Sequence, residues 1–207
     1  TAARTRPRTR RERPVPTYAL ITRATEEQVL TALRPSKLGG YLLPDGERGT
    51  GVLFDPLRPR FGKISSRRLV GPAWNLAWEL KQPVWLLRDN EWGTCVTLVL
   101  GNGDTEELGW SAHWTPPADP AENAAQRESW DRYCARLADR AGLPDAGAAL
   151  AAIRNDPAPD GSRTSGAELL GRLCALVGVS DAVVGQSLYE QAGPRGREAR
   201  RFEARGR

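Results

Sequence analysis

A chain of 207 residues of which 40% are hydrophobic is long and apolar enough to fold around its own core, which excludes a wholly disordered protein. Its three cysteines lie far apart and form no CxxC pair, so a disulfide framework and a zinc site are both disfavoured and a reducing compartment is favoured. The net charge of +5 at pH 7 suggests nucleic-acid binding, and its position along the chain decides which part would bind.

The excess positive charge lies in the two ends of the chain. Residues 1–14 contain six Arg and one acidic residue, and residues 193–207 contain six Arg and two acidic residues. Residues 15–192 contain 18 basic and 22 acidic residues, so this central part has a net charge of −4. Arg-rich tails bind polyanions without regard to sequence. The residues that we predict as nucleic-acid contacts in the tails are Arg4, Arg6, Arg8, Arg10, Arg11, Arg13, Arg195, Arg197, Arg200 and Arg201.

The N-terminal half predicts a strand, a helix and a hairpin in that order. A strand is expected at 18–22, and Thr25 can cap the next helix because Gln28, three residues on, completes a capping box. Residues 40–54 predict a hairpin, since two β-prone runs flank a Gly-rich polar turn. The apolar run at 18–21 is too short for a signal peptide or a membrane span, so we expect neither.

A second helix and a three-stranded meander follow. We predict that the helix begins with Pro72 at its first position and ends before Pro83. The strands are expected at 84–88, 94–100 and 106–110, because turn-forming residues separate these β-prone runs.

The segment 115–120 contains three prolines and is the best internal boundary. After it the pattern is helical. Asp119 and Pro120 start one helix, which Gly142 ends, and a short Ala-rich helix follows at 146–154. The capping signals of the last two helices predict the ranges 165–177 and 180–191.

This order predicts an α+β fold: an antiparallel or mixed sheet with two packing helices, followed by a helical C-terminal portion, with disordered Arg-rich tails. The expected divisions are a basic tail at 1–15, a sheet domain at 16–114, a linker at 115–120, a helical portion at 121–192 and a second basic tail at 193–207.

No established catalytic, cofactor or metal motif occurs, so we predict no catalytic, cofactor-binding or metal-binding residues. The single histidine, His113, lies two residues after Ser111, and an extended segment would place both on one face. A small enzyme centred on this pair is therefore the third hypothesis. A packing or surface role for His113 is the favoured interpretation.

Seven tryptophans are many for this length, and most fall between positions 74 and 114. Core packing explains such residues by default. If several share an exposed face, they become candidate contacts for a protein partner, because tryptophan is enriched at binding hot spots. The residues we assign to such a surface are Trp74, Trp78, Trp92, Trp110 and Trp114.

Residues 173–188 show a small residue, Cys174, four positions before a turn glycine, Gly178, and then an inward-facing Val184. This pattern resembles the helix-turn-helix of bacterial DNA-binding regulators. The resemblance implies DNA binding with Gln186 as the lone candidate for contacting a base edge. A plain helix, a glycine cap and a second helix explain the same residues.

Because catalytic constellations are absent, we expect an intracellular, cytoplasmic bacterial binding or regulatory protein without catalytic activity, which engages a protein partner through its aromatic α+β core. The alternative is a DNA-associated protein that uses 173–189 together with its tails.

Overall fold

The computed structural model describes residues 17–35, 38–54, 67–186 and 198–203. They form a seven-stranded antiparallel sheet in the order β6-β5-β4-β1-β3-β2-β7. The strands are β1 Thr17–Thr22, β2 Gly40–Pro44, β3 Thr50–Phe54, β4 Val84–Asn90, β5 Gly93–Val99, β6 Thr105–Ser111 and β7 Arg200–Phe202. The helices are α1 Glu26–Leu33, α2 Arg67–Leu80, α3 Pro120–Arg140, α4 Gly147–Ala151 and α5 Gly166–Val177, with short 3-10 turns η1 Gly46–Arg48 and η2 Pro144–Ala146.

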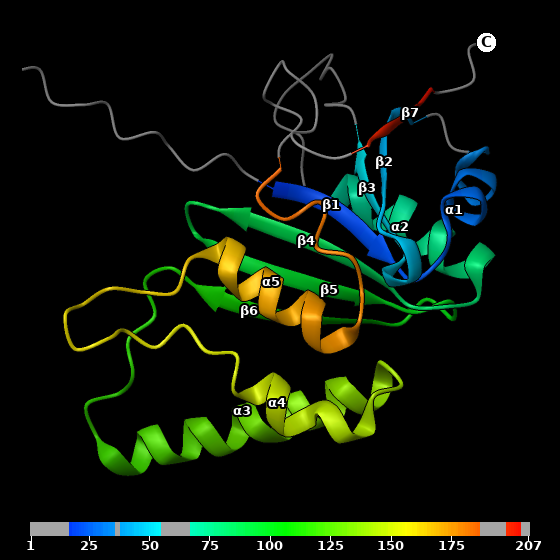
Figure 1. Cartoon of the computed structure of the whole chain (residues 1–207). Coiled ribbons are helices and arrows are strands. Elements are labelled where there is room, and N and C mark those ends of the chain that lie inside the picture. The colour runs from blue at the N-terminus through cyan, green and yellow to red at the C-terminus, as the bar shows by residue number, and fades with distance from the viewer. Residues whose placement is uncertain (1–16, 36–37, 55–66, 187–197, 204–207) are drawn as a thin grey trace, which may run out of the picture.

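Helices cover both faces of the sheet (Figure 1). Helices α1 and α2 pack on one face, and α3, α4 and α5 lie on the other. The predicted α+β fold is therefore confirmed, including the two helices that pack on the sheet and the helical character of the C-terminal half.

Local capping chemistry sets most helix ends where the sequence predicts them. Thr25 and Gln28 form the complete capping box of α1. The Asp119 side chain accepts a hydrogen bond from the N–H of Ala121 at the start of α3. Gly178 ends α5 in the left-handed conformation, with φ of 67°.

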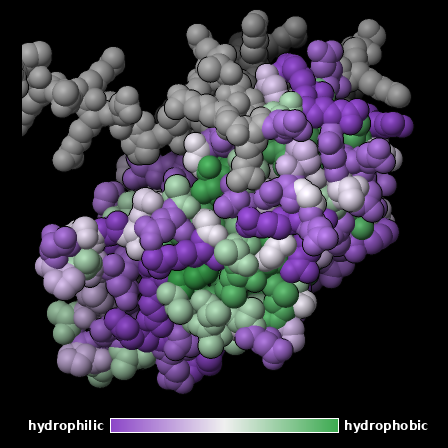
Figure 2. Space-filling model, in the orientation of Figure 1, coloured by the Kyte–Doolittle hydropathy of each residue, from purple (hydrophilic) through white to green (hydrophobic). Residues whose placement is uncertain are grey.

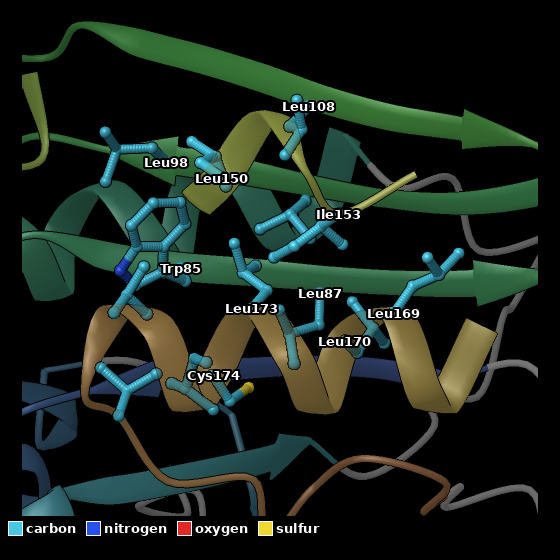
Figure 3. Close-up of a cluster of buried hydrophobic side chains, with 14 of the residues drawn as sticks. Trp85, Leu87, Leu98, Leu108, Leu150, Ile153, Leu169, Leu170, Leu173 and Cys174 are labelled. Carbon is cyan, nitrogen blue, oxygen red and sulfur yellow. The ribbon is translucent and has the colours of Figure 1, made fainter. Parts of the chain in front are cut away.

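The buried side chains form one cluster on each face of the sheet, because successive residues of a strand point to opposite faces. The larger cluster joins the sheet to α3, α4 and α5, and Figure 3 shows α5 lying over the sheet and running along the strands. Its members there include Trp85, Leu87, Leu98, Leu108, Leu150, Ile153, Leu169, Leu170, Leu173 and Cys174.

The start of α2 was predicted wrongly. The helix begins at Arg67, so Pro72 lies inside it and not at its first position. Pro72 has no N–H to donate to the carbonyl of residue 68, so the helix loses one hydrogen bond in its second turn. Val70 packs against the second cluster, and this contact favours helix before the proline.

Two predictions about the C-terminal helices also need correction. The Ala-rich helix α4 covers only five residues, and a 3-10 turn precedes it. Residues 180–186 form a turn where a helix was expected, and the remainder of that expected helix lies outside the described residues. Ser180 accepts a hydrogen bond from the N–H of Ala182, and Gly185 has φ of +71°. The buried side chains of Ala182 and Val183 then hold this turn on the sheet.

The C-terminal tail was expected to be disordered throughout, but residues 200–202 form β7 on the edge of β2. Phe202 is buried and packs edge-on against Phe54, with ring centroids 6.2 Å apart. One apolar side chain therefore anchors a basic segment to the sheet. No helix among the described residues has the length and apolar character required to cross a membrane.

Candidate functional site

A pocket of about 240 Å³ opens at the outer edge of β6. Three segments line it: the end of β6 with the chain that follows, the N-terminal half of α3, and the chain that leaves α4. In Figure 1 these segments meet on the side of the sheet where β6 leads down to α3. The lining residues are Gly109, Trp110, Ser111, Trp114, Asn123, Gln126, Arg127, Trp130, Arg154, Asn155 and Asp156. We call this site the tryptophan pocket.

The local structure explains how α3 and β6 supply their side chains. Positions 123, 126, 127 and 130 are spaced by three or four residues, so they lie on one face of α3. On β6, Trp110 lies on the same face as Leu108 and points to the helical layer, where it is 4% exposed.

Hydrogen bonds hold two of the three indoles in place. The Nε1–H of Trp110 donates to the carbonyl of Ile153 at 2.8 Å, and the Nε1–H of Trp130 donates to the carbonyl of Ala151 at 2.9 Å. Both bonds tie the end of α4 to the walls of the pocket. The third indole, Trp114, is half-buried. Two of the three aromatic walls are therefore fixed by hydrogen bonds, so a ligand would not have to order them.

The charges in the pocket are paired. A guanidinium nitrogen of Arg127 lies 3.5 Å from a carboxylate oxygen of Asp156, and a guanidinium nitrogen of Arg154 lies 2.9 Å from a carboxylate oxygen of Asp131. Arg154 also donates from Nε to the carbonyl of Ala151 at 3.0 Å. Each guanidinium has an acidic neighbour, so the pocket favours a neutral group over an anion.

The five tryptophans predicted to form one surface lie in three places. Trp110 and Trp114 belong to the tryptophan pocket, with Trp110 in the core. Trp74 and Trp78 project from α2 and are 44% and 52% exposed, and Lys81 lies 4.1 Å from the Trp78 ring centre. Trp92 is 71% exposed in the turn between β4 and β5. Trp130 completes the pocket and was not among the predicted contacts.

The surface offers one further apolar region on the face shown in Figure 2. There, hydrophobic surface gathers over α4 and the C-terminal part of α5. The exposed residues of α4 are the alanines Ala148 and Ala149. Such small side chains give little anchoring area compared with an indole, so the tryptophan pocket is the stronger candidate.

Ser111 and His113 are joined through the backbone. The N–H of His113 donates to the Ser111 hydroxyl at 3.2 Å. Within the described residues, the imidazole makes no hydrogen bond to that hydroxyl. The arrangement is therefore a local turn contact and not the base-to-nucleophile bond that general-base catalysis requires.

A polar cluster lies on the other face of the sheet. Arg88 donates to the thiol of Cys95 at 2.9 Å and to the carboxylate of Glu107. Burial raises the pKa of the Cys95 thiol to about 11, and the Arg88 charge opposes this rise. A thiol that stays protonated is a poor nucleophile. The described segments contain no group of three or more metal-ligating side chains.

The predicted nucleic-acid contacts fall partly outside the described residues, namely Arg4, Arg6, Arg8, Arg10, Arg11, Arg13, Arg195 and Arg197. Of the others, Arg200 forms an ion pair with Glu26 at 2.9 Å, and the Arg201 guanidinium lies 5.0 Å from the Tyr41 ring centre. Gln186 follows the turn at 182–185 and not a helix, so the described part of the expected recognition helix is missing.

The sequence predicted part of this site. Position 110 could have been assigned to the core, since Leu108 and Trp110 alternate with polar residues. The face of α3 at 123–130 was also visible in the residue spacing.

Comparison with known proteins finds no protein-family model, no curated protein and no solved structure that matches this chain.

Proposed function

We propose that this is a non-enzymatic, intracellular binding or regulatory protein of a bacterium, and that it engages a protein partner through the tryptophan pocket. The observation that carries this proposal is the convergence of Trp110, Trp114 and Trp130 with Arg127 and Arg154 around one open pocket. Tryptophan and arginine are the side chains most enriched at the energetic centres of protein interfaces.

The size and charge of the pocket support a protein partner over a free cofactor. Pockets for drug-sized ligands enclose about 300–1,000 Å³. The tryptophan pocket, at about 240 Å³, is smaller and suits a single inserted side chain. A nucleotide would bring phosphate charge to a site where Asp156 and Asp131 already accompany the arginines.

Site-specific photo-crosslinking in the native cells tests the proposal. A photoreactive phenylalanine derivative replaces Gln126, an exposed residue that lines the pocket, and in a second strain it replaces Asn75, an exposed residue of α2. We expect one protein to be captured from position 126 and not from position 75. Capture should disappear in Trp114→Ala and persist in Trp78→Ala, which removes an exposed indole elsewhere.

The purified partner then gives the affinity. A hot-spot truncation costs about 2 kcal/mol or more, so Trp114→Ala should weaken binding at least about tenfold, while Trp78→Ala should change it less than about twofold. The proposal fails if position 126 captures no protein, if it captures only nucleic acid, or if Trp114→Ala captures the same protein equally well.

A further inference from the structure

The outer edge of β6 carries backbone groups that point away from the sheet. Gly93 and Ser111 are opposite each other in the β5–β6 ladder, and the N–H of Ala112 donates to the carbonyl of Trp92 at 3.0 Å. Even-numbered residues of β6 therefore bond to β5. Because hydrogen-bonding direction alternates along an antiparallel strand, the N–H and C=O groups of Glu107, Gly109 and Ser111 point outward.

Side chains from α3 and from the chain after α4 bond to two of these outward carbonyls. The Tyr133 hydroxyl donates to the carbonyl of Glu107 at 2.5 Å, and the Asn155 amide donates to the carbonyl of Ser111 at 3.2 Å. Gly109 lies midway between them, is exposed, and lines the tryptophan pocket. Among the described residues, nothing pairs with the outward N–H and C=O of Gly109, so a donor and an acceptor are available at the opening of the tryptophan pocket, between two carbonyls that are already bonded.

We infer that the partner presents an extended segment to Gly109, and that an aromatic side chain of this segment fills the tryptophan pocket. The inference rests on the proposed function and specifies how the partner is held. A residue in an extended chain offers one N–H and one C=O on the same side, which matches the two free groups of Gly109. The segment pairs with β6 through one residue at Gly109. The side chain of that residue lies on the same face as Gly109, opposite Trp110, so the aromatic side chain that enters the pocket comes from a neighbouring residue of the segment.

The cavity walls select an aromatic side chain. Three indoles surround the space, and the guanidinium of Arg127 lies on its rim, where arginine can stack on an aromatic ring. A charged side chain would find no free opposite charge there, because the two arginines already form ion pairs with carboxylates. An aliphatic side chain would leave part of the space between the rings empty, which forfeits dispersion contacts.

Gly109 offers a matched pair of test variants. A Cβ at this position would meet only the carbonyl oxygen of Thr94, at 3.9 Å, so Gly109→Ala fits without strain. Gly109→Pro removes the outward N–H and places a ring on the pairing edge, but it removes no bond to β5, and proline is tolerated at such positions of edge strands. The two variants therefore differ in whether residue 109 has an outward N–H, and both keep the hydrogen bonds between β5 and β6.

The test uses the full chain and a phage-displayed library of random dodecapeptides. Peptides enriched on the unaltered protein are synthesised, and their affinity is measured by titration calorimetry against Gly109→Ala, Gly109→Pro and Trp114→Ala. We expect the enriched peptides to share an aromatic residue. Gly109→Pro and Trp114→Ala should each weaken binding at least about tenfold, and Gly109→Ala less than about twofold.

Amide hydrogen exchange of the unaltered protein keeps the test decisive if Gly109→Pro fails to fold. Bound peptide should slow exchange at Gly109 at least about tenfold, as expected for an amide that gains a hydrogen bond. Enriched peptides without an aromatic residue, unchanged exchange at Gly109, no enrichment of any peptide, or tighter binding of free mononucleotides than of peptides would overturn the inference. If position 126 still crosslinks a protein while Gly109→Pro binds it normally, the proposed function stands and the strand pairing is wrong.

Discussion

The guanidinium of Arg23 donates a hydrogen bond to the carbonyl oxygen of Val177 at 2.5 Å, although 154 positions separate the two residues. Val177 is the last residue of α5, where backbone carbonyls lack partners within the helix. Arg48 donates in the same way to the carbonyl of Val179 at 2.9 Å. Arg23 therefore caps the C-terminus of α5, where positive charge is also favoured by the helix dipole, and Arg48 holds the chain two residues beyond the helix.

Arg23→Met tests the strength of this cap. Hydrogen bonds from charged groups contribute about 1.5–3 kcal/mol, and because Arg23 is exposed we expect a loss of unfolding free energy at the lower limit of this range, about 1.5 kcal/mol. Arg172→Met is the control, because Arg172 lies on α5 in an exposed pair with Glu168 that is worth at most about 0.5 kcal/mol. Urea denaturation measures both. Equal losses in the two variants would show that Arg23 contributes no more than an ordinary surface charge.

Gly51 and Val183 give a second contact between distant segments. A Cβ at Gly51 would stand 2.5 Å from Cγ1 of Val183, which is fully buried. Gly51→Ala therefore forces the turn after α5 away from β3, and overpacking of this kind costs about 1–3 kcal/mol. The expected result is a urea midpoint lower than that of the unaltered protein.

A double-mutant cycle identifies the cause. If the clash with Val183 is responsible, Gly51→Ala should cost at least about 0.5 kcal/mol less in a Val183→Ala background than in the unaltered chain. Gly171→Ala controls for the effect of losing a glycine, because nothing lies within 4 Å of a Cβ there, and it should stabilise α5 by about 0.5–1 kcal/mol. Strictly additive losses at 51 and 183 would contradict the clash.

Elements defined by local chemistry were predictable from the sequence, and elements defined by distant contacts were not. The capping box at Thr25, the proline start of α3 and the glycine end of α5 depend on residues within one turn of each other. The turn at 180–186 has the same kind of capping signal, but the burial of Val183 against β3 decides its conformation. Nothing within that segment reveals this contact.

Part of the candidate site was likewise predictable from the sequence and part was not. The spacing of the aromatic and polar residues in α3 and in β6 indicates which of them share a face of their element. Arg154 and Asn155 follow a short helix with no distinctive pattern, and they reach the pocket because the carbonyls of Ala151 and Ile153 accept bonds from Trp130 and Trp110. The sequence predicted the residue types of a binding surface and not its location.

Stability should fall in alkaline solution because of Cys174. Burial raises the pKa of its thiol to about 12 in the folded protein. The thiol of an unfolded chain has a pKa of about 8.5. The unfolded state therefore releases this proton first, so the contribution is constant at neutral pH and is lost as pH rises from about 8.5 towards 12. The slope for one such proton is at most about 1.4 kcal/mol per pH unit.

The test compares two variants that each remove side-chain atoms from the core and leave a cavity. Cys174→Ala removes the titrating group, whereas Leu173→Ala on the same helix removes an equally buried side chain that does not titrate. Urea midpoints between about pH 8 and pH 10.5 should decline less steeply in Cys174→Ala than in the unaltered protein, and Leu173→Ala should keep the steeper decline. The same slope in all three proteins would contradict the assignment.

The last prediction concerns Phe202, the buried residue of β7. Its ring packs edge-on against Phe54, so Phe202→Ala should lower the unfolding free energy by about 3 kcal/mol. Glu203→Ala, next to it and exposed, should change it by less than about 0.5 kcal/mol.

Salt separates this apolar contribution of β7 from its charge. Arg200 pairs with Glu26 at the surface, and the Debye length falls to about 3 Å at 1 M salt, so any loss in Arg200→Ala should vanish there. The loss in Phe202→Ala should persist or grow, because burial of an aromatic ring does not depend on screening. If salt instead abolished the Phe202→Ala deficit, charge would hold β7 in place, and the basic C-terminal segment could be deleted without disturbing the core.

With the expected result, deleting residues 193–207 removes part of the sheet, so nucleic-acid binding by the tail has to be tested through substitutions at Arg195 and Arg197.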